Sequence, residues 1–181
     1  MNDQVRAEFK RIFNGRFSTS ESTRANYARG EDTFDPILSK AVVFPETNEE
    51  VSKILSLCNE HKIPVVPFGT GTSLEGNVVG NDKGITISLE KMNKVLSVNA
   101  EDFDCRVQAC VTKEQLNEYL REDGVFFPID PGANAAIGGM ASTSASGTMA
   151  VKYGTMKTAI SGLTVVLPNG CLLYTSDAAD E

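Results

Sequence analysis

The sequence predicts an α+β fold with two lobes and a cleft between them. Two short apolar runs, residues 41–44 and 63–68, flank a helical pattern. Strand, helix and strand in this order suggest a right-handed crossover that joins a parallel pair of strands. From residue 84 the chain adds further strand patterns and a helix of its own. We therefore expect a small βαβ lobe and a larger mixed β-sheet lobe flanked by helices.

The first 61 residues contain two predicted helices. An amphipathic helix over residues 5–13 precedes a polar, irregular lead-in at residues 14–36, so residues 1–40 form an N-terminal extension. The second helix begins after Thr47, which together with Glu50 matches a capping box. His61 at its end is expected to be solvent-facing or locally bonded rather than catalytic. The apolar stripe of the second helix is predicted to comprise Val51, Ile54, Leu55 and Cys58.

The later elements are predicted in the same way. Residues 84–89 alternate as a strand with Ile85, Ile87 and Leu89 on one face, and residues 94–99 and 104–111 are two more strands. Thr112 opens a helix with a capping box to Gln115, and Gly124 ends it. Residues 160–167 form a last apolar strand before a Pro-Asn-Gly turn. The core face of the helix is expected to be Leu116, Tyr119 and Leu120.

Composition restricts the possible functions. Apolar residues make up 41% of 181 residues, mean hydropathy is −0.16, and no run has the length of a membrane span. The net charge of −7 without a Lys/Arg cluster argues against nucleic-acid binding. The four cysteines form no CxxC motif, so buried free thiols are favoured over zinc or disulfides, and no metal is expected. We expect a cytoplasmic protein whose membrane contact is at most peripheral.

Residues 64–76 read PVVPFGTGTSLEG, an apolar strand that ends in a Gly/Thr turn. Glycines at such a turn can point consecutive N–H groups into one concavity, which binds an anion through backbone dipoles. Asn77 stands where a P-loop needs Lys, and the third glycine of a Rossmann fingerprint is missing. By itself the segment also fits an ordinary turn.

Residues 127–154 are dense in Gly, Ala, Ser and Thr and contain only two charged residues, Asp130 and Lys152. Apolar residues within the stretch favour a packed segment over a hydrated linker. Small residues allow close backbone approach to a large flat ligand. A tightly packed helix N-terminus at residues 136–139 is the structural alternative.

Together the two glycine-rich stretches resemble the FAD-binding domain of the vanillyl-alcohol-oxidase/PCMH-type flavoproteins. The resemblance covers residues 41–170 and is closest to the group of the glycolate oxidase D-subunit and FAD-linked D-lactate dehydrogenases. It is carried by AVVFPET, PVVPFGTGTSLEG, NAEDFDCRVQACVT, FPIDPGANAAIGGMASTSASGT, VKYGTMK and LTVVLPNG.

The resemblance implies that residues 67–73 wrap the FAD pyrophosphate and that small residues of the second stretch line the rest of the cofactor. Relatives with covalent flavin carry a His in the first loop, where this chain has Thr72, so FAD is expected to be non-covalent. The implied cofactor residues are Pro67, Phe68, Gly69, Thr70, Gly71, Thr72, Ser73, Gly132, Ile137, Gly138, Gly139, Thr143, Ala145, Ser146, Gly147, Tyr153 and Gly154.

The implied activity is oxidation of a D-2-hydroxy acid, of the D-lactate or glycolate type, by hydride transfer to FAD and then to a quinone, cytochrome or other carrier. Substrate-binding and catalytic residues would lie in a downstream cap domain, so no catalytic residue is assigned. We expect residues 1–170 alone to bind FAD weakly or not at all and to lack dehydrogenase activity. The alternatives are a PCMH-type reductase of the UDP-N-acetylenolpyruvoylglucosamine type and a non-catalytic flavin- or nucleotide-binding module.

Residues 171–181, CLLYTSDAADE, resemble the conceptual translation of a sequencing-library transposon adapter. They are therefore predicted to be a non-native tail on an N-terminal fragment. A native strand with an acidic tail is the alternative.

Overall fold

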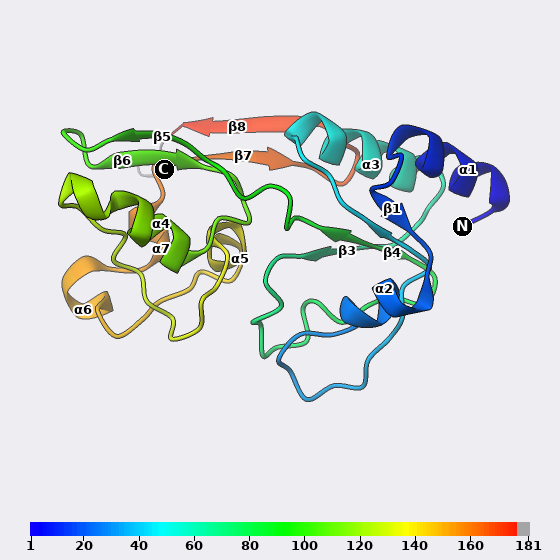
Figure 1. The fold of residues 1–181 in the computed structure, drawn as a ribbon, viewed down its shortest axis with the longest axis horizontal. Coiled ribbons are helices and arrows are strands. Elements are labelled where there is room, and N and C mark those ends of the chain that lie inside the picture. The colour runs from blue at the N-terminus through cyan, green and yellow to red at the C-terminus, as the bar shows by residue number, and fades with distance from the viewer. Residues whose placement is uncertain (177–181) are drawn as a thin grey trace. The chain divides into compact units, whose positions relative to one another are not determined.

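A computed structural model describes residues 1–176 (Figure 1). Their helices and strands are mixed, which confirms the α+β class. The chain divides into two compact units, the first made of Met1–Lys91 and Leu163–Thr175, the second of Met92–Gly162 continuing at residue 176. The first unit contains the βαβ segment together with the N-terminal residues 1–40.

The first unit is built on a four-stranded sheet of order β1-β2-β4-β3. β1 (Phe17–Ser18) is antiparallel to β2 (Val42–Val43), whereas β4 (Ile85–Ser88) is parallel to both β2 and β3 (Val65–Phe68). β2 and β3, the strands on either side of the crossover helix, are therefore not paired with each other. The sequence had suggested that these two strands form a parallel pair.

β4 lies between β2 and β3 because it is a buried strand. All four of its residues are buried, so the strand needs a neighbour on each edge and a cover on each face. The alternation of Ile85 and Ile87 did not indicate that Thr86 and Ser88 are buried as well. The Thr86 hydroxyl is satisfied by Ser39, at 2.8 Å between the two oxygens.

Two helices pack against this sheet. α1 (Asp3–Ile12) is capped by Asn2, and α3 (Asn48–Glu60) is capped by Thr47, as predicted, and ends at His61. Leu57 lies in the core while Val51 and Leu55 are only half-buried, which shifts the predicted stripe of α3. The shared core consists of Val5, Phe9, Phe13, Ala41, Val43, Ile54, Leu57, Cys58, Ile63, Ile85 and Ile87.

The lead-in at residues 14–36 is more ordered than predicted. It holds β1 and a short helix, α2 (Glu21–Asn26), which is capped by Ser20. A two-residue strand carries no periodicity, and α2 buries no residue, so neither leaves a pattern in the sequence.

The last strands, β7 (Gly162–Val166) and β8 (Leu172–Ser176), form a two-stranded sheet. The predicted Pro-Asn-Gly turn joins them, and the Gly170 carbonyl accepts a hydrogen bond from Ser52 of α3 at 2.5 Å. Residues 172–176 are thus a strand, while the rest of the predicted foreign tail, residues 177–181, lies outside the described residues. Its foreign origin stays a prediction.

The second unit contains a hairpin and several short helices. The hairpin pairs β5 (Val95–Asn99) with β6 (Asp104–Val107). β6 ends at Val107, so the strand predicted over residues 104–111 is shorter than expected. α4 (Lys113–Leu120) begins at the predicted Thr112 cap and passes into a 3₁₀ turn, η1 (Arg121–Asp123), that ends at Gly124. The remaining helices are α5 (Ile137–Ser142), α6 (Ala150–Tyr153) and α7 (Met156–Ala159).

Two small cores hold this unit together. Val111, Leu116 and Leu120 form one, and Ile129, Met140 and Met156 form the other. Tyr119 was predicted to face the core but is 58% exposed, because the buried stripe of α4 includes only Leu116 and Leu120.

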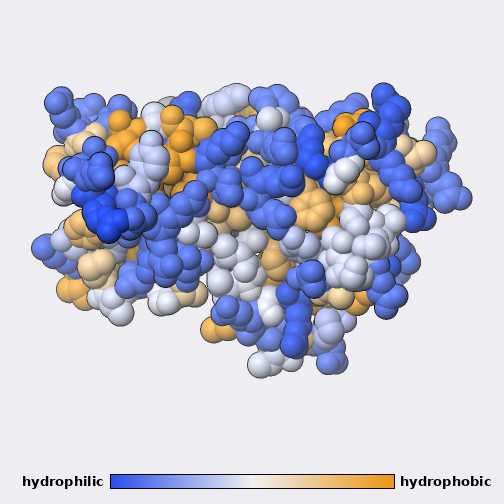
Figure 2. All heavy atoms as spheres, in the orientation of Figure 1, coloured by the Kyte–Doolittle hydropathy of each residue, from blue (hydrophilic) through white to orange (hydrophobic). Residues whose placement is uncertain are grey.

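The surface agrees with the composition. Polar residues cover most of the face drawn in Figure 2, with hydrophobic residues in small groups. Cys58 and Cys110 are buried, but Cys105 is half-buried and Cys171 is exposed, so only part of the predicted thiol burial holds. Within residues 1–176 no helix combines the length and apolar character that crossing a membrane requires.

Candidate cofactor-binding site

The first glycine-rich stretch leaves the sheet directly after β3. The Phe68 carbonyl accepts the last ladder bond, from the Leu89 N–H at 2.9 Å, and the chain then turns through residues 69–73. Gly71 has φ +76°, and a Cβ added there would lie 2.8 Å from Cζ of Phe68. A glycine is therefore required at position 71 by its backbone conformation and by the ring beneath it.

The N–H groups of this turn are unused. Within the described residues, none of the backbone N–H groups of Gly69–Ser73 donates a hydrogen bond to a protein acceptor. The Thr70 and Thr72 hydroxyl oxygens lie 3.3 Å apart beside them. Residues 67–73 carry no charged side chain. A run of free N–H groups and hydroxyls without a charged side chain is suited to an anion held by the backbone.

A segment that the sequence analysis missed closes on this turn from the outside. The Glu31 N–H donates to the Gly71 carbonyl at 2.8 Å, and a Cβ at Gly30 would lie 2.3 Å from the same oxygen. The sequence signal was present as Arg-Gly-Glu-Asp, a turn composition at residues 29–32, inside a stretch regarded as irregular.

The second stretch divides into packing residues and open residues. The Ile137 and Gly138 N–H groups donate to Val111 and Ala109 carbonyls, both at 2.8 Å. A Cβ at Gly138 would meet Cβ of Ala109 at 2.8 Å, so Gly138 serves close packing. Gly139 is exposed, with nothing within 4 Å of an added Cβ. Of the predicted glycine pair, Gly139 is the one free to face a ligand.

Asp130 brings two further predicted glycines together. Its carboxylate accepts the Gly132 N–H at 3.4 Å, and a Cβ at Gly147 would lie 1.9 Å from its carbonyl oxygen. Lys113 donates to Asp130 Oδ1 at 2.7 Å and lowers the pKa of that carboxyl. The one acidic residue of the stretch is thus ionised and compensated.

The other predicted residues of the second stretch are placed by local contacts. The Thr143 hydroxyl donates to the Gly139 carbonyl at 3.1 Å, and Ala145 N–H donates to Met140 at 2.9 Å. Ser146 is exposed. Two more, Tyr153 and Gly154, end α6: Tyr153 lies edge-on to Phe126 at 5.6 Å between ring centroids, and Gly154 has φ +80°.

The predicted residues therefore form two local groups. Pro67–Ser73 lie in the first unit, and those from Gly132 to Gly154 lie in the second. Binding of one dinucleotide by both groups stays a prediction.

Comparison with known proteins identifies the fold. The family model described as an FAD binding domain matches residues 39–176. The chain belongs to this FAD-binding domain family. The family resemblance and the FAD cofactor inferred from the sequence are confirmed, and the FAD-binding domain includes both glycine-rich stretches.

Among relatives of this FAD-binding domain, D-lactate dehydrogenase (cytochrome) 1, mitochondrial, of Saccharomyces cerevisiae is 48% identical over 75% of this chain and 24% of that protein. The Arabidopsis thaliana D-lactate dehydrogenase (cytochrome), mitochondrial, is 41% identical over 96% of this chain and 31% of the relative. Glycolate oxidase subunit GlcD of Bacillus subtilis is 31% identical over 88% of this chain and 34% of that protein. The chain thus spans about a third of these relatives or less.

A solved structure described as alkyldihydroxyacetonephosphate synthase shares the fold of the FAD-binding domain. It matches with a TM-score of 0.87 at 23% identity and covers 97% of this chain and 34% of that one. At this identity the likeness shows the fold alone.

The residues present fit the FAD cofactor. The diphosphate of FAD carries about two negative charges, which the unused N–H groups after β3 can meet without a cation. Gly71, buried and at φ +76°, keeps that part of the turn free of a side chain.

Proposed function

We propose that this chain is the FAD-binding part of a dehydrogenase that oxidises a D-2-hydroxy acid of the D-lactate or glycolate type. The observation that carries the proposal is the cation-free turn of unused N–H groups in a chain 41% identical to a D-lactate dehydrogenase over 96% of its length. Bound FAD would supply hydride acceptance from the substrate carbon.

The chain's own residues bind and orient in this proposal. The N–H groups of Gly69–Ser73 hold the diphosphate, and the hydroxyls of Thr70 and Thr72 add donors. Gly132 and Gly139, where an added Cβ would meet nothing within 4 Å, allow the backbone of the second stretch to approach the cofactor closely. FAD is held without a covalent bond, since Thr72 offers no imidazole.

The substrate side of the proposal rests on the relatives. Catalytic and substrate-binding residues are assigned to none of the described residues, because the chain spans 24–34% of the relatives named above. A quinone, cytochrome or other carrier would accept the electrons. The proposed location is cytoplasmic or peripheral to a membrane, while the plant and yeast relatives are named as mitochondrial.

The test uses protein expressed from its complete reading frame. We expect a yellow protein that reduces a dye acceptor with D-lactate or glycolate and not with L-lactate. A colourless protein that takes up no added FAD would contradict the cofactor. A flavoprotein that ignores both acids but oxidises NADPH with a UDP-enolpyruvyl sugar would establish the reductase alternative instead.

A further inference from the structure

We propose that residues 28–34, here termed the N-terminal clamp, are a positioning element that orients the N–H groups of the glycine turn toward the FAD diphosphate. The clamp lies outside the matched family region, residues 39–176, and belongs to the same unit as the turn. The inference rests on the proposed role of the turn in binding FAD.

The decisive contact is made on the Gly71 carbonyl. Glu31 N–H donates to this oxygen at 2.8 Å, and the Gly30 backbone is so close that an added Cβ would lie 2.3 Å from it. In a trans peptide the C=O and the next N–H point in opposite directions. By holding the Gly71 carbonyl, the clamp therefore turns the Thr72 N–H away from itself.

The electrostatic consequence favours an anion. A carbonyl oxygen that pointed toward a bound diphosphate would repel it, whereas N–H groups attract it. Among the described residues, the clamp takes up the Gly71 carbonyl while the N–H groups from Gly69 to Ser73 donate to no protein group. The protein thus satisfies this acceptor of the turn and leaves its donors free.

Asp32 gives the clamp its shape. Asp32 is buried, with 6% of the residue exposed. Its two carboxylate oxygens accept hydrogen bonds from the Gly30 and Phe34 N–H groups, each at 3.0 Å. Both bonds fold residues 30–34 into a tight turn around the carboxylate. The buried charge is therefore used to fix the segment that contacts Gly71.

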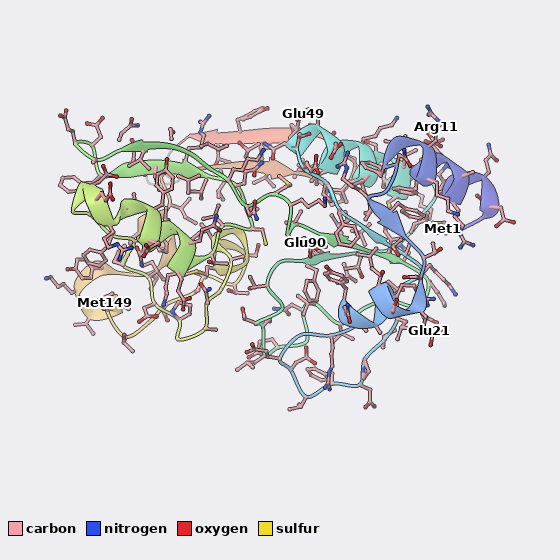
Figure 3. All side chains as sticks on the ribbon, viewed as in Figure 1. Met1, Arg11, Glu21, Glu49, Glu90 and Met149 are labelled. Atoms are coloured by element: carbon pink, nitrogen blue, oxygen red, sulfur yellow. The ribbon has the colours of Figure 1, made fainter. Side chains whose placement is uncertain are left out.

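The clamp is anchored on both sides of the glycine turn. The Ala28 carbonyl accepts the Gly80 N–H at 2.9 Å, and the Phe34 ring lies 2.7 Å from where a Cβ would stand on Gly76. Just before the clamp, Tyr27 lies edge-on to Phe68, with ring centroids 5.1 Å apart, and its hydroxyl donates to Glu90. Glu90 follows β4 (Figure 3).

The experiment compares two pairs of variants in protein from the complete reading frame. Gly30→Ala forces a Cβ against the Gly71 carbonyl, and Gly84→Ala is its control because it makes the same 2.3 Å clash with a carbonyl, that of Pro64, before β3. Glu31→Pro deletes the N–H donor, and Glu31→Ala keeps it. Two quantities are measured: the ratio of FAD to FMN affinity, and hydrogen exchange in the apoprotein of the Gly80 N–H, which donates to the Ala28 carbonyl of the clamp.

We expect Gly30→Ala and Glu31→Pro to lower the FAD/FMN affinity ratio by about tenfold, because FMN lacks the diphosphate that the turn holds. Exchange of the Gly80 N–H should rise in both, because a clamp that loses its hold on Gly71 holds Gly80 less firmly. Gly84→Ala and Glu31→Ala should keep the wild-type ratio even if Gly84→Ala lowers the melting temperature. An unchanged ratio together with unchanged exchange in both test variants would overturn the proposal.

The proposed function and the positioning role of the clamp can be refuted separately. If wild-type protein binds no FAD, the proposed function is wrong, and hydrogen exchange alone then decides whether the clamp positions the turn. If the wild type binds FAD but Glu31→Pro and Glu31→Ala are alike in ratio and exchange, the clamp is wrong and the proposed function stands. Should Gly30→Ala fail to fold, the Glu31 pair supplies the test.

Discussion

Phe68 lies directly beneath Gly71, with its Cζ 2.8 Å from the position that a Cβ on residue 71 would take. Phe68 is also the last residue of β3, paired with Ser88 in the sheet. The ring that closes the strand therefore supports the turn that follows it. A rigid strand thus fixes the backbone that would meet the cofactor.

Gly71→Ala should both destabilise the protein and weaken FAD binding. The left-handed φ of +76° costs a non-glycine residue about 1–2 kcal/mol, and the added methyl must displace the Phe68 ring. Gly15→Ala is the control, because Gly15 has φ +73° with nothing within 4 Å of an added Cβ. Thermal unfolding should show that Gly71→Ala loses at least as much stability as Gly15→Ala. FAD titration should show a loss of affinity for Gly71→Ala alone. Equal FAD affinity in the two variants would contradict the role of the turn.

Glu50→Gln should lower stability by about 1 kcal/mol at neutral pH. Arg16 forms a two-pronged bond to Glu50, with both N–O distances at 2.5 Å, and this bond lowers the pKa of the Glu50 carboxyl. Glu50 also accepts the Glu46 N–H at 2.7 Å, so the carboxylate joins α3 to the residues before it.

The sign of the pH dependence follows from the lowered pKa. A carboxyl with a depressed folded pKa stabilises fully above its ordinary value of 4.5, and this contribution is lost as pH falls through the folded value. Urea unfolding of wild type and Glu50→Gln should therefore differ at pH 7 and converge in acid. Glu60→Gln, at the exposed end of the same helix, is the control. A difference that persists at the lowest pH would show that the ion pair is not its source.

The thiols should separate sharply in reactivity. Burial raises the pKa of Cys58 to about 12, whereas Cys171 is exposed. At pH 8 a thiol of pKa about 12 is ionised in roughly one molecule in ten thousand, so Cys58 should react only when the protein opens. In the 181-residue chain, alkylation followed by mass spectrometry should label Cys171 first and Cys58 only with denaturant. Rapid labelling of Cys58 in native protein would contradict its burial.

The elements with local signals could be predicted from the sequence. Thr47 and Thr112 predicted the starts of their helices, because a threonine hydroxyl before an amphipathic run commonly caps the helix N-terminus. Strand order could not be predicted, because a short apolar run does not say which edges are paired. The placement of β4 between β2 and β3 depends on burial of Thr86 and Ser88, two residues that resemble surface residues by type.

For the candidate site, residue types predicted the backbone conformation of a glycine, but they did not predict which protein groups contact the glycines. Of the two glycines of the first turn that were expected to adopt backbone angles closed to other residues, Gly71 does so with φ +76°, whereas Gly69 has no positive φ. Gly138 belongs to the second glycine-rich stretch, but its N–H donates to the Ala109 carbonyl, a contact that spacing along the chain cannot reveal. The Gly30 and Glu31 contacts with the Gly71 carbonyl join residues about forty positions apart, so no local pattern indicates them.

Denaturation of the protein should release FAD in chemically unmodified form. Residues 67–73 contain no histidine, cysteine or tyrosine that could hold the flavin by a covalent bond, and His61, the single histidine of the chain, ends α3 before β3 begins. Acid precipitation of the holoprotein followed by centrifugation should place the yellow colour in the supernatant, with the mass of FAD. Wild type and Thr72→Ala should behave alike in this step, since neither offers an imidazole, thiol or phenol at position 72. Flavin that stays in the pellet after washing, and on one peptide after proteolysis, would show that a residue elsewhere in the protein forms the bond.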